Sequence, residues 1–176
     1  ILIGKDAGDS ITTCNKTILI GTDAGQAITV TAGGASDGTI AVGHSALTAL
    51  TSGANNTAIG YQSQLALTAG SNNVTIGWKT LDAADGTESD NIAIGADAMG
   101  GVDEGSHGSA LANGNIAIGG DALTGGSFGS SDLDLLGNIA IGYQSVVSTG
   151  AYAQTGTIGI GYQALNALTT GAKNTA

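Results

Sequence analysis

The stretch Asn56-Thr57-Ala58-Ile59-Gly60-Tyr61-Gln62 decides the fold, because close copies of it recur along the whole chain. Each copy places a short apolar run before a glycine, here called the anchor glycine, and successive anchor glycines lie 17 to 24 residues apart. A constant motif with variable spacing is typical of a solenoid, in which each copy builds one rung and the loops between rungs differ in length. The anchor glycines are Gly4, Gly21, Gly43, Gly60, Gly77, Gly95, Gly119, Gly142 and Gly161.

The residues directly before each anchor glycine predict a short strand. Almost every residue one or three positions before it is Ile or Val, and mostly small residues stand two positions before it. β-Branched residues favour strands, and successive side chains of a strand point to opposite faces. The sequence therefore predicts an all-β fold, a parallel β-solenoid or β-roll of about nine rungs, formed as one repetitive segment by residues 1–176.

The alternation also suggests which face is buried. We expect the β-branched rows to stack into ladders that fill a narrow core, with the structural ladder made by Ile20, Val42, Ile59, Ile76, Ile94, Ile118, Ile141 and Ile160. The small row carries no charge, which indicates close packing against another chain or another layer. This row predicts an oligomer contact through Ala41, Ala58, Ala93, Ala117 and Ala140.

Each anchor glycine is expected to turn a sharp corner, where positive φ or close backbone approach excludes a side chain. Small and apolar residues follow three and four positions later, which indicates a segment that returns inward. An asparagine stands before many strands and is expected to form a further ladder that caps turns. These asparagines are Asn56, Asn73, Asn91, Asn115, Asn138 and Asn174.

Composition excludes several function classes. The 176 residues include 31 Gly, no Pro and only 3% aromatic residues, which is little material for an ordinary globular core. With 14 acids and four lysines, the net charge of −10 argues against binding to nucleic acid or anionic lipid. No apolar run reaches the roughly 18 residues of a membrane span. A surface of Thr, Ser, Asn and Gly is more usual for an extracellular fibre than for a cytosolic domain.

The chain begins inside one copy of the motif and stops inside another. We therefore expect it to be a piece cut from a longer fibre protein. Cys14 stands alone, so no disulfide can form within the chain. A small, half-buried role is expected for this residue, with a bridge between chains as the alternative.

Candidate catalytic and metal-binding residues share no motif. No pair of acids is fixed across a cleft, as a glycosidase would need, and neither an EF-hand loop nor the repeat of calcium β-rolls occurs. We predict that the chain is not an enzyme and carries no cofactor, with structural calcium as the alternative. The residues weighed are His44 and His107, the acids Asp85, Glu88 and Asp90 of one insert, and Asp132 and Asp134 of another.

Two further features could carry recognition. Aromatic residues follow four anchor glycines, namely Tyr61, Trp78, Tyr143 and Tyr162. We expect them to cap the corner of the core, with a sugar-stacking stripe as the alternative. Inserts rich in Gly, Ser and Asp hold most of the variation between rungs, and loops carry recognition more often than strands do. These inserts are 31–38, 83–90, 100–114 and 124–137.

The units 56–62, 142–145 and 161–165, joined by Thr/Ser-Gly linkers, resemble the head repeats of YadA-like trimeric autotransporter adhesins. They resemble even more closely the related repeats of phage tail fibres, and the resemblance covers essentially the whole chain. It implies a trimer of left-handed parallel β-rolls with one turn per repeat. The adhesin heads have shorter and more even repeats, so the longer spacings here favour decorated loops.

Together these features predict a structural, self-assembling segment of an extracellular or virion fibre, a tail-fibre or adhesin shaft that supports attachment to a cell surface. Its expected partner is itself, as a homotrimer, and its expected location is extracellular, on a cell surface or on a virion. One alternative is a module that binds a receptor or glycan through the insert loops. Another is a monomeric solenoid that forms head-to-tail filaments.

Overall fold

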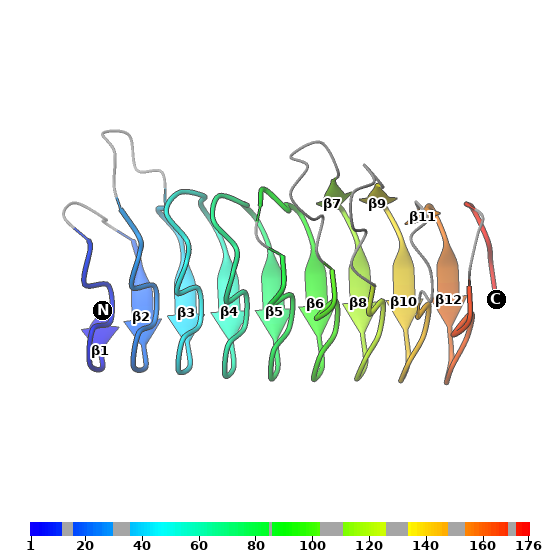
Figure 1. Cartoon of the computed structure of the whole chain (residues 1–176), viewed down its shortest axis with the longest axis horizontal. Coiled ribbons are helices and arrows are strands. Elements are labelled where there is room, and N and C mark those ends of the chain that lie inside the picture. Colours follow the sequence, from blue (N-terminus) through cyan, green and yellow to red (C-terminus); the bar gives the residue numbers. More distant parts are fainter. Residues whose placement is uncertain are drawn as a thin grey trace.

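The computed structural model describes residues 1–11, 16–29, 36–84, 86–102, 111–125, 134–147, 154–168 and 172–176. These residues form an all-β structure in which parallel strands stack as a β-solenoid (Figure 1), as predicted. Within the described ranges there is no helix that could span a membrane. The main sheet has nine strands: β1 (Leu2–Ile3), β2 (Ile18–Ile20), β3 (Ile40–Val42), β4 (Thr57–Ile59), β5 (Val74–Ile76), β6 (Ile92–Ile94), β8 (Ile116–Ile118), β10 (Ile139–Ile141) and β12 (Ile158–Ile160).

Neighbouring strands pair in the register set by the anchor glycines. Ile20 pairs with Val42, for example, and Ile94 pairs with Ile118. A second sheet of three two-residue strands forms in the order β11-β9-β7, beyond the ends at which β8, β10 and β12 begin (Figure 1). The inserts before β8 and β10 therefore end in ordered strands. The strands of this second sheet are β7 (Ala112–Asn113), β9 (Leu135–Leu136) and β11 (Gln154–Thr155).

The anchor glycines form the corners that the sequence predicts. Their φ angles lie between 128° and 146°, a region that side chains rarely adopt. A Cβ at Gly60 would lie 2.0 Å from the carbonyl oxygen of Gly77, and one at Gly119 would lie 2.5 Å from that of Gly142. Each corner from Gly4 to Gly142 therefore rests directly on the backbone of the next rung, and only glycine fits there.

The seven rungs from Gly43 to Gly161 also contain three left-handed positions each, which the sequence analysis did not predict. They lie two and four residues after the anchor glycine and five residues before it. Around Gly77 they are Lys79 at φ 51°, Leu81 at φ 50° and Asn72 at φ 61°. The position before the strand holds Gly, Asn or Asp in most rungs, which are the residues that tolerate this conformation best.

The two faces of the main sheet are the reverse of the predicted ones. Residues two positions before the anchor glycine point inward, whereas those one and three positions before it are partly exposed. Ile59, Ile76 and Ile118, for example, retain 38%, 39% and 36% of their exposure. The prediction of an oligomer contact through the alanine row is therefore wrong. All five of its residues are fully buried within their own chain: Ala41, Ala58, Ala93, Ala117 and Ala140.

A limit on volume explains this reversal. The segment that returns after each corner delivers a residue four positions after the anchor glycine into the same interior, where Leu47, Leu81 and Leu123 are buried. Where that residue is Gly25 instead, the strand carries the larger Leu19, whose methyl group would lie 2.9 Å from an added Cβ. The inward strand position and the position four residues after the anchor glycine thus share a space with room for one large side chain, so the β-branched rows must lie outside.

Candidate assembly face

The outward rows of the main sheet form a continuous apolar surface, here called the Ile/Val face. It consists of the residues one and three positions before each anchor glycine. No residue in it is charged, and Thr57 is the one member that is neither Ile nor Val. Its members are Ile1, Ile3, Ile18, Ile20, Ile40, Val42, Thr57, Ile59, Val74, Ile76, Ile92, Ile94, Ile116, Ile118, Ile139, Ile141, Ile158 and Ile160.

The size of this face is that of the largest apolar patch on a typical monomer, and such a patch is often functional. Nine strands at the usual spacing of about 4.8 Å extend about 38 Å, and three residues across a strand give a width of about 10 Å. The face therefore covers about 400 Å² in projection, which is comparable to the largest apolar patch on a typical monomer. Patches of this kind commonly mark sites of association.

A ladder of buried asparagines holds neighbouring strands in register. The side-chain oxygen of Asn115 accepts hydrogen bonds from both the backbone N–H and the side-chain amide of Asn138, each at 3.0 Å. The amide of Asn115 in turn donates to the carbonyl of Leu135 at 2.7 Å. Equivalent bonds join Asn56, Asn73 and Asn91. The predicted ladder is confirmed from Asn56 to Asn138, and its bonds join successive rungs.

The aromatic residues after the anchor glycines lie at the surface. Tyr61 is 44% exposed and Tyr143 is 47% exposed. The His44 and Tyr61 rings stack with centroids 5.4 Å apart, and those of Tyr143 and Tyr162 stack at 5.8 Å. Lys79 places its ammonium 5.2 Å from the centroid of the Trp78 ring. These rings therefore stack along an exposed corner and do not close the core.

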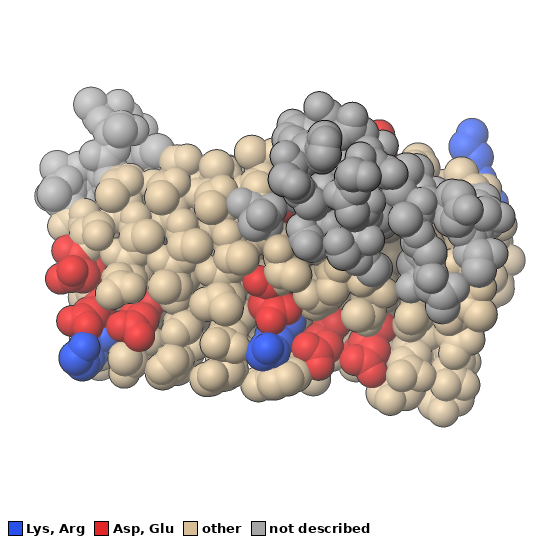
Figure 2. Space-filling view, viewed as in Figure 1, with Lys and Arg blue, Asp and Glu red and all other residues tan. Residues whose placement is uncertain are grey.

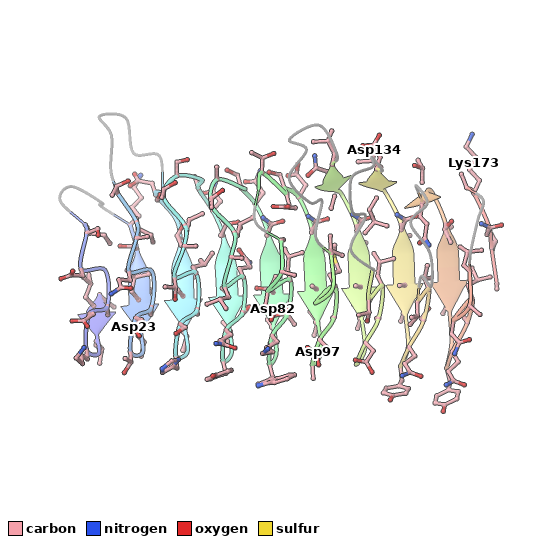
Figure 3. The ribbon with its side chains drawn as sticks, in the orientation of Figure 1. Asp23, Asp82, Asp97, Asp134 and Lys173 are labelled. Atoms are coloured by element: carbon pink, nitrogen blue, oxygen red, sulfur yellow. The ribbon has the colours of Figure 1, made fainter. Side chains whose placement is uncertain are left out.

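Charged residues gather on loops and corners (Figure 2). Figure 3 shows Asp82 and Asp97 in the half of the molecule where the main strands end, and Asp134 and Lys173 beyond the ends at which the strands begin. Burial raises the pKa of the Asp82 carboxyl, and the Lys79 ammonium 3.7 Å away partly opposes this rise. Partial burial and the neighbouring Asp121 carboxylate raise the pKa of Asp97.

The acids considered as metal ligands have separate partners. Glu88 accepts hydrogen bonds from the backbone N–H of Gly86, and Asp90 accepts one from the amide of Asn72 at 3.0 Å. Asp134 accepts the N–H of Leu111 at 3.2 Å. Among the described residues, no three His, Cys, Asp or Glu side chains lie close enough together to hold a metal ion. Four residues weighed above lie outside the described ranges: Cys14, Asp85, His107 and Asp132.

The proposed recognition loops are only partly described. Of the inserts 100–114 and 124–137, the structure describes 100–102, 111–114, 124–125 and 134–137. The other ladder of the surface, made by the residues five positions before the anchor glycine, joins Asn55 to Asn72 and Asn72 to Asp90 through side-chain hydrogen bonds of 3.3 and 3.0 Å. All members of the Ile/Val face, by contrast, lie within the described ranges.

Comparison with known proteins finds no relative. No model of a protein family matches the chain, and no curated protein or solved structure matches it either. Any statement of function therefore depends on the arrangement of residues described above.

Proposed function

We propose that this chain is a self-assembling structural segment of an extracellular or virion fibre, a shaft that supports attachment to a cell surface. The observation that carries the proposal is the Ile/Val face, which is free of charge along nine strands of a chain with a net charge of −10. Apolar surface of this extent is stabilised by removal from water. A second copy of the same face offers the same repeat along its length.

The periodicity of the face favours copies that lie side by side with parallel axes. Isoleucine rows repeat at the strand spacing of about 4.8 Å, so two such faces interlock along their full length only when their axes are aligned. Association around one axis also closes, which limits the number of copies. The resemblance to trimeric adhesins and tail fibres favours a left-handed β-roll in three copies, with the Ile/Val faces toward the common axis.

The first test is the solution mass of the chain by sedimentation equilibrium, together with a variant that charges the face. Ile118→Asp with Ile141→Asp places two carboxylates on adjacent strands of the face. The native chain is expected at three times its 16.9 kDa mass, and the variant as a monomer. A circular dichroism spectrum rich in β-structure shows that the variant is folded.

A matched control adds the same charge elsewhere on the same two rungs. Gly114 and Gly137 have φ angles of 68° and 62°, and nothing lies within 4 Å of an added Cβ at either one. Asp90 occupies the equivalent position at φ 62°, so Gly114→Asp with Gly137→Asp should fit the fold. This control should keep the native mass. A native chain that sediments as a monomer at micromolar concentration would overturn the proposal.

A further inference from the structure

The buried apolar residues of the solenoid form two separate clusters. One contains residues of the rungs up to β4 and ends with Ala58 and Leu67. The other begins with Leu81 and Ala84 and continues to Val146. No residue joins the two clusters across the boundary between the rungs of β4 and β5, although the main sheet runs through it without a break.

Polar side chains occupy the interior at this boundary. Ser63, Gln64, Thr75 and Thr80 are fully buried at positions where neighbouring rungs carry alanine or leucine. The Ser63 hydroxyl bonds with both threonine hydroxyls, and the amide of Gln64 donates to the Thr75 hydroxyl at 2.8 Å. The oxygen of the Gln64 amide has no partner among the described residues. The interior of the rod thus changes here from apolar packing to a polar network.

The rungs of β4 and β5 are joined mainly by hydrogen bonds. The N–H of Thr57 donates to the carbonyl of Asn73 at 2.8 Å, and that of Gly77 donates to Ile59 at 2.8 Å. The Asn56 and Asn73 side chains continue the buried ladder. Even the outward face changes at this level, because Thr57 interrupts the Ile/Val row. In a stack stabilised by contacts between neighbouring rungs, this junction lacks the apolar contribution that couples the others.

We propose that the junction between β4 and β5 divides the rod into two cooperative units, residues 1–70 and 72–176, and is the place where the rod opens first. Each unit keeps its own apolar cluster when the junction opens. Under mechanical load or heat, such a rod separates at the junction between β4 and β5, and the rungs on either side stay folded. The division is a property of the chain's own interior and is independent of how many copies associate.

Native-state hydrogen exchange on the full chain tests the proposal. The amides of Gly60 and Gly119, which donate within the two units, report on their opening as denaturant is raised. Each should open with a denaturant dependence about half that of the whole chain, because this slope scales with the surface exposed. The repaired variant Ser63→Ala, Gln64→Leu, Thr75→Ala and Thr80→Ala fills the junction with the residues of neighbouring rungs. In this repaired variant, the amides of Gly60 and Gly119 should exchange through one shared opening. Its denaturant dependence should equal that of the whole chain, about twice the native value.

A second variant moves the boundary and serves as the matched control. In the repaired background, Ala98→Ser, Met99→Gln, Ala117→Thr and Ala122→Thr copy the polar set to the junction between β6 and β8. The amide of Gly77 should then exchange with the unit that contains Gly60. The N–H of Gly142, which donates to Ile118 beyond the new junction, should exchange separately. One shared opening with the full slope in the native chain overturns the proposal. A boundary that stays at β4 and β5 in the second variant also overturns it.

Discussion

At the scale of the residue, the anchor glycine sets how closely two rungs approach. Gly119 and Gly161 have nearly the same φ, 132° and 134°, but different surroundings. An added Cβ meets the Gly142 carbonyl oxygen at 2.5 Å in the first case and nothing within 4 Å in the second. Alanine substitution at the two positions therefore distinguishes the cost of the backbone conformation from the cost of the contact with the next rung.

We expect Gly161→Ala to lower the free energy of unfolding by about 1–3 kcal/mol through backbone strain alone. Gly119→Ala should cost about 1–3 kcal/mol more, because the backbone of the next rung must move away. Chemical denaturation of the two variants beside the native chain gives both values. Equal losses would show that the contact between rungs contributes nothing.

At the scale of the element, the buried asparagine ladder ties each strand to the next. Asn115→Ala leaves both donors of Asn138 and the carbonyl of Leu135 without their partner in the ladder. Unpaired buried groups are costly, so the variant should lose about 3 kcal/mol of stability. The surface control is Asn72→Gly, which breaks an exposed ladder at a position where Gly38 and Gly114 occur with similar φ.

The Asn72→Gly control should lose at most about 1 kcal/mol of stability, because the exposed groups that it leaves unpaired can bond with water instead. Thermal unfolding followed by circular dichroism ranks the two variants. If Asn72→Gly lowered stability as much as Asn115→Ala, burial would add nothing to the contribution of the asparagine ladder. The comparison also shows how far the register of the sheet depends on side chains.

The strands and their pairing could be predicted from sequence because β-branched residues and glycines recur at fixed offsets. The residues from Ile92 to Ile94, for example, form β6, and the corner falls at Gly95 as expected. Alternation alone defines two faces but does not say which one is inside. The usual preference of large apolar residues for the core pointed to the wrong one.

The side chain that decides the question lies outside the strand. Leu123, four residues after its anchor glycine, fills the interior next to Ala117, so no room remains there for an isoleucine. The sequence did contain a signal for the buried face. Four positions after the anchor glycine, Gly8 and Gly25 replace the usual large residue in the rungs whose strands carry Leu2 and Leu19. Their complementary sizes indicate a shared interior. With the faces assigned correctly, the sequence also predicts the exposed Ile/Val face.

At the scale of the whole molecule, the rod should tolerate the loss of a complete rung. Deleting residues 61–77, which is 17 residues from one anchor glycine to the next, joins Gly60 to Trp78 in register. The product should fold and be shorter by one strand spacing, about 4.8 Å, which small-angle scattering can measure. Strand content by circular dichroism should fall only in proportion.

A deletion shorter by one residue is the control. Removing 61–76 leaves Gly77 directly after Gly60, so everything beyond moves by one position relative to the corner. A slip of one residue exchanges the two faces of a strand, and this variant should lose β-structure or become prone to aggregation. If both deletions behaved alike, the anchor glycines would not define the register.

The direct contact between successive anchor glycines also bears on inheritance. Since each corner is supported in the same way by the corner that follows, a gene segment that encodes one rung can be duplicated or lost by recombination between similar neighbours. Such an event keeps the contact between corners and the register of the strands. Length can then drift in whole steps from one lineage to another, while selection holds the cross-section constant. The number of repeats becomes the trait that varies, and the sequence of the corner becomes the trait that does not.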